Sequence, residues 1–588
     1  MRYIPLIFLL LFSYTCLQAQ NEDRTWVFGY KYSEQPLANG IYFDFNDSLQ
    51  ITFKSKPMSI LQSSAMICDS SGKLSLFSNG CYIDNGNNEY IANSDGLNPG
   101  AVYNEFCVQD TGGYATGYNS DNTMVFLPDP GNKDQVYLFH IPTLWVFQPF
   151  DAYYNQLNYT KIDLKGNAGI GSVVEKNKFL ISDTLHYDGL AAVRHGNGRD
   201  WWVVMAKQFS NVYYLVLLTP DGITIKTQAI GTPTWSQSGG EFVFSPDGTK
   251  LARFNAKDDL RIFDFDRCNG TLSNPMYVGI QDNGDNQIFS GLAFSGDGHF
   301  LYAAENYRLL QFDMWAANIA ASKTIVSEKE SLPACSLGGT IAYMELAPDG
   351  RIYSRPLNGQ RCMHRMQFPE RLGIACNFQQ HYYQFPYSFK NLPHLPNFRL
   401  GPIDGSACDT LGMDNHPLAD WRYDHTGTFG VDFTELAAYA PQNWDWDFGD
   451  PLSGLDNHSS QRNPSHFFSQ TGVFEVCLTV SNAYGSDTRC KNVWITTVPT
   501  IEPASSESIS IFPNPNSGSF TLYYQLEQNQ GASFLLYNAL GQEVYQTPLP
   551  GTTGNIAMQL DHLAPGIYFY IVPGGSAPIS GRLMISKE

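Results

Sequence analysis

The sequence predicts an all-β protein in which a β-propeller of about seven blades is followed by two immunoglobulin-like β-sandwich domains. Three observations support this prediction. Aromatic residues make up 14% of the 588 residues and charged residues only 16%, a composition typical of chains built mainly from strands. A glycine turn recurs about every 50 residues in the first four hundred positions. The chain is also too long for a single hydrophobic core, so several domains are expected.

The repeat lies within residues 21–400. Four glycines end tight turns between apolar runs, at intervals of 50, 50 and 52 residues: Gly198, Gly248, Gly298 and Gly350. This period with strand–turn–strand content is typical of propeller blades, and Asp-Gly supplies the left-handed backbone that a tight turn requires. Earlier turns at Gly72 and Gly131 have longer connections. A β-helix or a row of sandwiches would explain the equal spacings less simply.

A propeller must also close its ring so that no strand edge is exposed. We expect a strand at Trp26–Tyr30 or Ile41–Phe45 to pair with strands near Tyr382–Phe385. Asn79-Gly80 and Leu395–Phe398 are similar to stretches of uncharacterised surface propellers that carry the same two downstream domains. That resemblance implies an architecture and no particular reaction.

The second predicted domain spans residues 404–498. Its motifs Trp444–Asp450, Asn463–Phe468 and Gly472–Val476 resemble those of the PKD domain, an immunoglobulin-like sandwich. An aromatic residue such as Trp446 on a central strand would fill the space between two sheets. The resemblance implies a spacer or an interaction module.

Ten cysteines remain when Cys16 is set aside with the leader segment, an even number that suits an oxidising compartment. If residues 474–481 and 488–495 form a hairpin, Cys477 lies directly opposite Cys490, close enough for a disulfide with a small adjustment. The sequence therefore predicts a Cys477–Cys490 bridge. The pairing of the other eight cysteines does not follow from the sequence.

The last predicted domain, residues 505–588, consists of short β-rich runs separated by Asn, Gly and Pro. Its motifs, in order, resemble the type A sorting domain of the type IX secretion system of Bacteroidetes-type bacteria. The resemblance implies export across the outer membrane by that machinery, removal of the domain, and release or surface attachment. An ordinary immunoglobulin-like adhesion domain is the alternative. The motif residues are Pro513, Asn514, Pro515, Gly541, Gly566, Tyr568, Gly581 and Lys587.

The other end of the chain predicts export independently. Arg2 precedes an apolar stretch from Ile4 to Phe12, and Ala19 is a small residue at a suitable cleavage position, so residues 1–19 are predicted to be a signal peptide. The apolar stretch is too short to span a bilayer. A lipoprotein attached through Cys16 is the less favoured alternative, because bulky Tyr14 and β-branched Thr15 precede it.

Charge and motifs limit the function. The net charge of −20 argues against nucleic acid or an anionic membrane as a partner. The sequence has no metalloprotease, nucleophile-elbow, phosphate-loop or EF-hand motif, so no catalytic, cofactor-binding or metal-binding residue is assigned. Structural calcium at Asp84–Glu89 or Asp282–Asn286, and ligand stacking on Trp145, Trp235 or Trp315, are weaker hypotheses than a solvated loop and ordinary packing.

Two functional hypotheses follow. The first is a non-catalytic surface protein whose propeller binds a glycan or protein ligand. The second is a secreted hydrolase or lyase of polysaccharide or protein with its site in the propeller funnel. The second requires convergent carboxylates, or a carboxylate–histidine pair within hydrogen-bond reach.

Overall fold

The computed structural model describes Gln20 to Ile585 with internal gaps. The predicted signal peptide, Asp282–Asn286 and five of the sorting-motif residues (Pro513, Asn514, Pro515, Gly541 and Lys587) lie outside the described residues. The residues outside the description are 1–19, 31–37, 109–116, 148–149, 236–238, 256, 281–289, 331–339, 358, 497–507, 513–515, 527–531, 539–541, 573–578 and 586–588.

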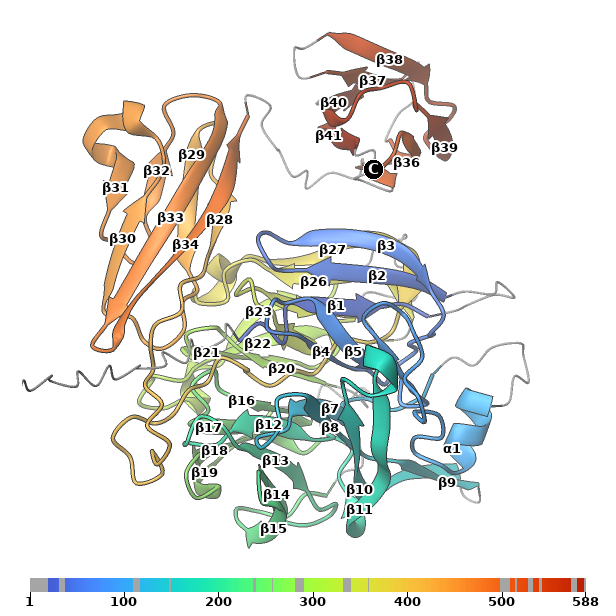
Figure 1. Ribbon diagram of the computed structural model, residues 1–588, viewed down its shortest axis with the longest axis vertical. Helices are drawn as coiled ribbons and strands as arrows, with labels where there is room; N and C mark the ends of the chain where they lie inside the picture. Colours follow the sequence, from blue (N-terminus) through green and yellow to red (C-terminus); the bar gives the residue numbers. More distant parts are fainter. Residues whose placement is uncertain are drawn as a thin grey trace, which may run out of the picture.

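Seven antiparallel sheets follow one another in the described part of the first four hundred residues (Figure 1). The first two sheets have three strands each: β1 (Thr25–Phe28), β2 (Ala38–Asp44), β3 (Gln50–Lys56), and β4 (Ala65–Cys68), β5 (Leu74–Ser78), β6 (Ile83–Asn85). The third has five: β7 (Met124–Pro128), β8 (Gln135–His140), β9 (Thr143–Phe147), β10 (Phe150–Asp163) and β11 (Ser172–Leu185). A short helix, α1 (Ala101–Tyr103), and a π-helical turn, η1 (Asn104–Val108), precede the third sheet.

The last four sheets are four-stranded and keep the sequence order of their strands. They consist of β12 (Ala191–Arg194), β13 (Trp201–Ala206), β14 (Val212–Thr219), β15 (Gly222–Ala229); β16 (Glu241–Phe244), β17 (Lys250–Asn255), β18 (Asp259–Asp266), β19 (Thr271–Val278); β20 (Gly291–Phe294), β21 (Phe300–Ala304), β22 (Arg308–Asp313), β23 (Thr324–Glu328); and β24 (Met344–Leu346), β25 (Ile352–Ser354), β26 (Gln360–Met366), β27 (Phe378–Phe389). Three 3-10 turns interrupt the propeller: η2 (Asn167–Gly169), η3 (Ala320–Ser322) and η4 (Gly373–Cys376).

These sheets are the blades of a propeller, as the glycine spacing predicts. The first strands of successive blades are neighbours, β1 beside β4, β4 beside β7, and β12, β16, β20 and β24 in a row. Each of the four repeated glycines has a positive φ, between 71° and 77°, at the turn from the first to the second strand of its blade. A residue with a Cβ rarely adopts this backbone conformation, so the turn favours glycine.

The predicted closure of the ring by strand pairing is wrong. In the described residues β1 pairs with β2, and β27 pairs with β26, so the first and last blades share no hydrogen-bonded strand. They are joined instead by side chains: the ring centroid of Phe43 lies 5.9 Å from those of both Tyr383 and Phe385. The first and last strands of the propeller pair with strands of their own blades, so neither blade contributes a strand to the other.

The chain that leaves the last blade runs along the propeller axis. Near its start, Asn391 donates to Val27 O of the first blade, at 3.5 Å, and to Ser64 Oγ beside β4, at 3.2 Å. Further along, the Phe398 ring packs 5.6 Å from Trp201 of the fourth blade, and Phe398 O accepts from Arg194 at the end of β12. A segment that touches so many blades in turn fills the centre of the ring.

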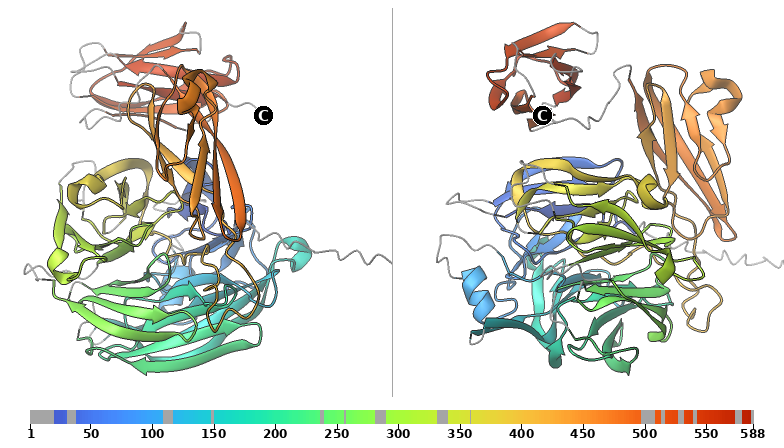
Figure 2. Two further views of the ribbon diagram at one scale, coloured as in Figure 1. Left: turned by 90° about the vertical axis from the view of Figure 1, so that its left-hand side faces the viewer. Right: turned by 180° about the vertical axis from the view of Figure 1, so that it is seen from behind.

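The PKD-like domain is a two-sheet sandwich, drawn in orange and rising from the propeller in Figure 2. Trp446 is fully buried between the sheets, 5.6 Å from the ring of Trp421, as the sandwich prediction requires. Its sheets are β28 (Trp421–His425), β29 (Gly430–Glu435), β32 (Ser465–Phe467), and β31 (His458–Ser459), β30 (Asn443–Asp447), β33 (Gly472–Asn482), β34 (Gly485–Ile495), with the 3-10 turn η5 at Pro451–Asn457.

The C-terminal domain is a second sandwich with a core of its own, and every member of that core lies between residues 509 and 585. Tyr568 is buried there and donates from its hydroxyl to Ala564 O at 2.8 Å, and Gly581 stands opposite Tyr570 in the sheet. Its sheets are β35 (Ser508–Phe512), β36 (Ser519–Gln525), β39 (Thr553–Gln559), and β38 (Glu543–Pro548), β37 (Ser533–Tyr537), β40 (Gly566–Val572), β41 (Ile579–Ile585).

Candidate functional site

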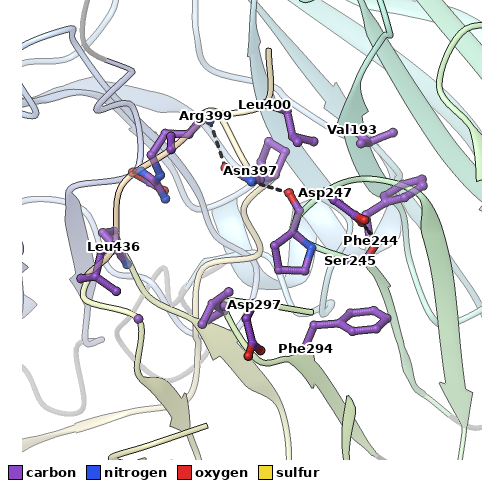
Figure 3. A pocket seen from close by; sticks show the side chains of 18 of the residues that line it. Val193, Phe244, Ser245, Asp247, Phe294, Asp297, Asn397, Arg399, Leu400 and Leu436 are labelled. Carbon is purple, nitrogen blue, oxygen red and sulfur yellow. Dashed lines mark hydrogen bonds and ion pairs between the residues drawn. The ribbon is translucent and has the colours of Figure 1, made fainter. Parts of the chain in front are cut away.

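A cavity of about 800 Å³ lies between one face of the propeller and the PKD-like sandwich (Figure 3). Turns after the first strands of three blades form one side of it, and the segment after β29 forms the opposite side, with Leu436 facing Phe244 across the space. The volume lies within the range of small-ligand sites. We call this space the interdomain cleft; its exposed or half-buried lining includes Phe244, Asp247, Asp297, Leu436, Tyr439 and Tyr484.

Two carboxylates project from equivalent turns of neighbouring blades. Ser245 Oγ donates to Asp247 Oδ1 at 2.5 Å, and Ser295 Oγ donates to Asp297 Oδ1 at 2.6 Å. A backbone N–H two residues further on, from Thr249 or His299, donates to the same oxygen at 3.0 Å. The repeated Ser-x-Asp-Gly sequence therefore fixes two exposed carboxylates in the same geometry at the rim.

The axial segment forms the floor of the cleft. Asn397 Nδ2 donates to Pro246 O at 2.7 Å, which ties the floor to the turn that carries Asp247. Arg399 forms two hydrogen bonds with the Asp23 carboxylate, at 2.7 and 2.6 Å. Because these polar groups satisfy one another, the floor is fixed before any ligand arrives.

Two buried carboxyl groups lie deeper along the axis. Glu241 Oε2 accepts from Leu292 N at 2.6 Å and from Met344 N at 3.4 Å, so it links β16 to the first strands of the next two blades. Burial raises the pKa of Glu241 to about 8. Burial likewise raises the pKa of Glu345 well above its ordinary value, with the nearby Glu241 carboxyl acting in the same direction.

His394 is the histidine of the cleft floor, and its Nδ1 lies 3.9 Å from Glu345 Oε2. Burial lowers the pKa of His394 to about 4, so this imidazole is neutral near pH 7. Glu345 Oε1 accepts instead from Leu395 N at 3.2 Å. His394 and Glu345 are too far apart for a direct hydrogen bond. The hydrogen bond from Leu395 N to Glu345 anchors the axial segment.

The predicted disulfide, the Asp84–Glu89 loop, Trp235 and Trp315 lie away from the cleft, and the Trp145 side chain lies outside the description. Cys477 stands opposite Cys490 in the β33–β34 hairpin, and a disulfide joins them. Trp235 and Trp315 are 63% and 68% exposed, and Trp315 stacks on His299 with ring centroids 3.8 Å apart. In the Asp84–Glu89 loop, Asn85 Oδ1 accepts from Asn87 N and Glu89 N, which accounts for that polar cluster as a turn.

Within the described ranges, no group of three or more His, Cys, Asp or Glu side chains could hold a metal ion. Among those same residues, no helix combines the length and hydrophobicity that a membrane span requires. The sandwich side of the cleft, which includes Leu436, Tyr439 and Tyr484, could not be predicted from the sequence, because no linear pattern shows which face of one domain meets another.

The architecture defines a class: a seven-bladed propeller packed against a PKD-like sandwich, with a separate C-terminal sandwich. Residues 419–497 match the PKD domain family, and residues 510–586 match the secretion system C-terminal sorting domain family. The protein therefore carries a type IX sorting domain and is exported to the cell surface or the extracellular space. No curated protein sequence matches the chain.

Solved structures of low sequence identity are also similar. A protein from Lactobacillus plantarum is 12% identical, with 63% of this chain and 98% of that one covered and a TM-score of 0.37. An exo-beta-1,3-galactanase from Phanerochaete chrysosporium is 10% identical, with 81% and 92% covered and a TM-score of 0.29. A gluconolactonase from Xanthomonas campestris is 11% identical, with 58% and 95% covered and a TM-score of 0.26.

Proposed function

We propose that this exported protein is a surface recognition protein that binds an extracellular glycan segment in the interdomain cleft without converting it. The observation that carries this proposal is the composition of the cleft walls. Exposed carboxylates on two blades line the cleft together with phenol rings and an apolar wall contributed by the PKD-like domain. In this function the propeller is the recognition platform, and the PKD domain is an interaction module that completes the site.

The chemistry of the walls supports a glycan ligand. A sugar ring has apolar C–H faces, which pack on aromatic rings, and hydroxyl groups, which donate to carboxylates. Tyr484 is 43% exposed and offers such a ring, while Asp247 and Asp297 offer acceptors at the rim. The fixed floor reduces the entropy lost when a ligand binds.

Binding of a polysaccharide panel to the mature protein tests this proposal. Tyr484→Ala and Asp297→Asn should each weaken binding of the selected glycan about tenfold. Their controls are Tyr307→Ala, an exposed tyrosine away from the cleft, and Asp221→Asn, an exposed turn aspartate. If both cleft variants bind as tightly as their controls, the glycan does not bind in the cleft.

A secreted hydrolase or lyase is the second candidate, because Glu345 and His394 do line the cleft. In that case the Glu345 carboxyl, whose pKa is raised by burial, would act as the general acid on a bound polymer. This candidate predicts release of shorter products from the polysaccharide and loss of that release in Glu345→Gln. Saturable binding without product supports recognition instead.

A further inference from the structure

The seam between the first and last blades of the propeller is the one that no loop between consecutive strands crosses. In the described chain the strands of neighbouring blades form separate sheets, and across this seam apolar side chains such as Trp26 and Tyr353 pack together, with ring centroids 5.8 Å apart. Opening this seam would expose the apolar faces that the first and last blades bury against each other.

One strand of the PKD-like domain lies across the seam with its polar face toward the propeller. The side chains on this face are spaced two residues apart. Asp420 directly precedes β28, and Arg422 and Asp424 lie within it, so the three side chains share one face of the sheet. The intervening Trp421 and Tyr423 contribute to the core of the sandwich. The polar face is therefore free to contact the blades.

At the N-terminal end of β28, this face contacts the first blade. The Arg24 guanidinium, just before β1, forms a buried ion pair with Asp420, and Lys491 Nζ lies 2.7 Å from the other Asp420 oxygen. Arg489 of the sandwich donates to Asn46 O, just after β2. Burial alone would raise the pKa of Asp420, but Arg24, Lys491 and Arg489 hold it well below its ordinary value.

At the C-terminal end of β28, the same face contacts the last blade. Arg351 Nη2, from the turn before β25, donates to Asp424 Oδ1 at 2.5 Å, and Gln367 donates to the same oxygen. Arg422 donates to Asp349 O at 3.0 Å and to Gln367 O at 3.2 Å. One short strand thus binds both blades that border the seam.

We infer that the PKD-like domain is the latch that closes the propeller ring. Asp420 binds Arg24 of the first blade, and Asp424 binds Arg351 of the last blade. Because both aspartates lie on one strand of the sandwich, the distance between them is fixed. Because these charged groups are buried, removing one of them leaves an unpaired buried charge on its partner, which strongly destabilises the contact between the domains. The domain thereby holds the first and last blades together, which is the role predicted for strand pairing between them.

Hydrogen exchange in the full-length protein tests the latch. Asp420→Asn should make the amides of β1–β3 and β24–β27 exchange about tenfold faster while β16–β19 is unchanged. The matched control is Asp450→Asn, because Asp450 is an equally buried aspartate whose partners Ser469 and His466 lie within the sandwich. The control should change exchange in the sandwich alone. If Asp420→Asn also affects only the sandwich, the latch does not exist.

A steric wedge provides a second test that leaves every charge in place. A Cβ at Gly350 would lie 2.6 Å from Leu436 Cδ2 and 2.7 Å from Arg422 Nη1, both on the sandwich. Gly298 has nearly the same φ in the equivalent turn, but the nearest atom to its Cβ is 3.8 Å away. Gly350→Ala should speed exchange at the seam beyond what Gly298→Ala does. Equal effects of the two variants would overturn the latch.

Discussion

Cys268, in the loop after β18, is joined by a disulfide to Cys408, in the segment that leads from the propeller to the PKD-like domain. The two cysteines are 140 residues apart in sequence. The bond ties this connecting segment to the fifth blade, on the face where the interdomain cleft opens. The segment also pairs with the propeller backbone, because Ile403 N donates to Gly196 O at 2.8 Å.

Replacing both cysteines by serine should lower the free energy of unfolding by about 5 kcal/mol. A cross-link over so long a loop removes much of the conformational entropy of the unfolded chain, and that benefit is lost in the variant. Chemical denaturation of the oxidised wild type and the double variant measures the difference. Limited proteolysis should also cut the variant first in residues 402–416.

The matched control is the Cys477→Ser, Cys490→Ser variant, whose disulfide closes a loop of only 13 residues within one hairpin. Its loss should cost about 3 kcal/mol, less than the long-range bond, and should destabilise the sandwich alone. A larger loss from the short loop than from the long one would contradict this account of the Cys268–Cys408 bond.

Glu241 makes the stability of the propeller depend on pH. Its pKa is about 8 in the folded protein against 4.5 for an ordinary glutamate, because burial disfavours the charged form. The folded state therefore holds this proton more tightly than the unfolded chain. The resulting stability is complete below pH 4.5 and is lost as the pH rises through 8.

In wild type, the free energy of unfolding should fall between pH 4.5 and 8 as Glu241 loses its proton. Glu241→Gln should reduce this fall by an amount on the order of a few kcal/mol. Denaturation midpoints measured across this pH range test the prediction. Glu475→Gln, at an exposed position of the sandwich, should retain the wild-type slope. An unchanged slope in Glu241→Gln would mean that the carboxyl is charged in the native fold.

The sequence predicted those features that depend on local repetition or register. Gly198, Gly248, Gly298 and Gly350 each require a positive φ, so the spacing of the blades is visible in the amino acids themselves. Cys477 and Cys490 belong to one hairpin, whose period of two residues determines which side chains stand opposite each other.

Features that depend on distant contacts could not be predicted in this way. Ring closure failed as a prediction because strand composition alone does not show whether β1 pairs within its own blade or with the last one. The Asp420–Arg24 ion pair joins residues 396 positions apart, and each is an ordinary charged residue in the sequence. The cleft likewise forms only where two separately predictable domains meet.

The last prediction concerns export. Deleting residues 505–588 should leave the protein folded but retained within the cell envelope, because the C-terminal sandwich has a separate core and carries the sorting domain. Protease treatment of intact cells, followed by immunoblotting, compares the truncated and full-length chains. Thermal denaturation of the purified truncated protein provides the folding control, since the propeller and PKD-like cores should melt as in the full chain. Equal surface exposure of a correctly folded truncated chain would show that another segment directs export.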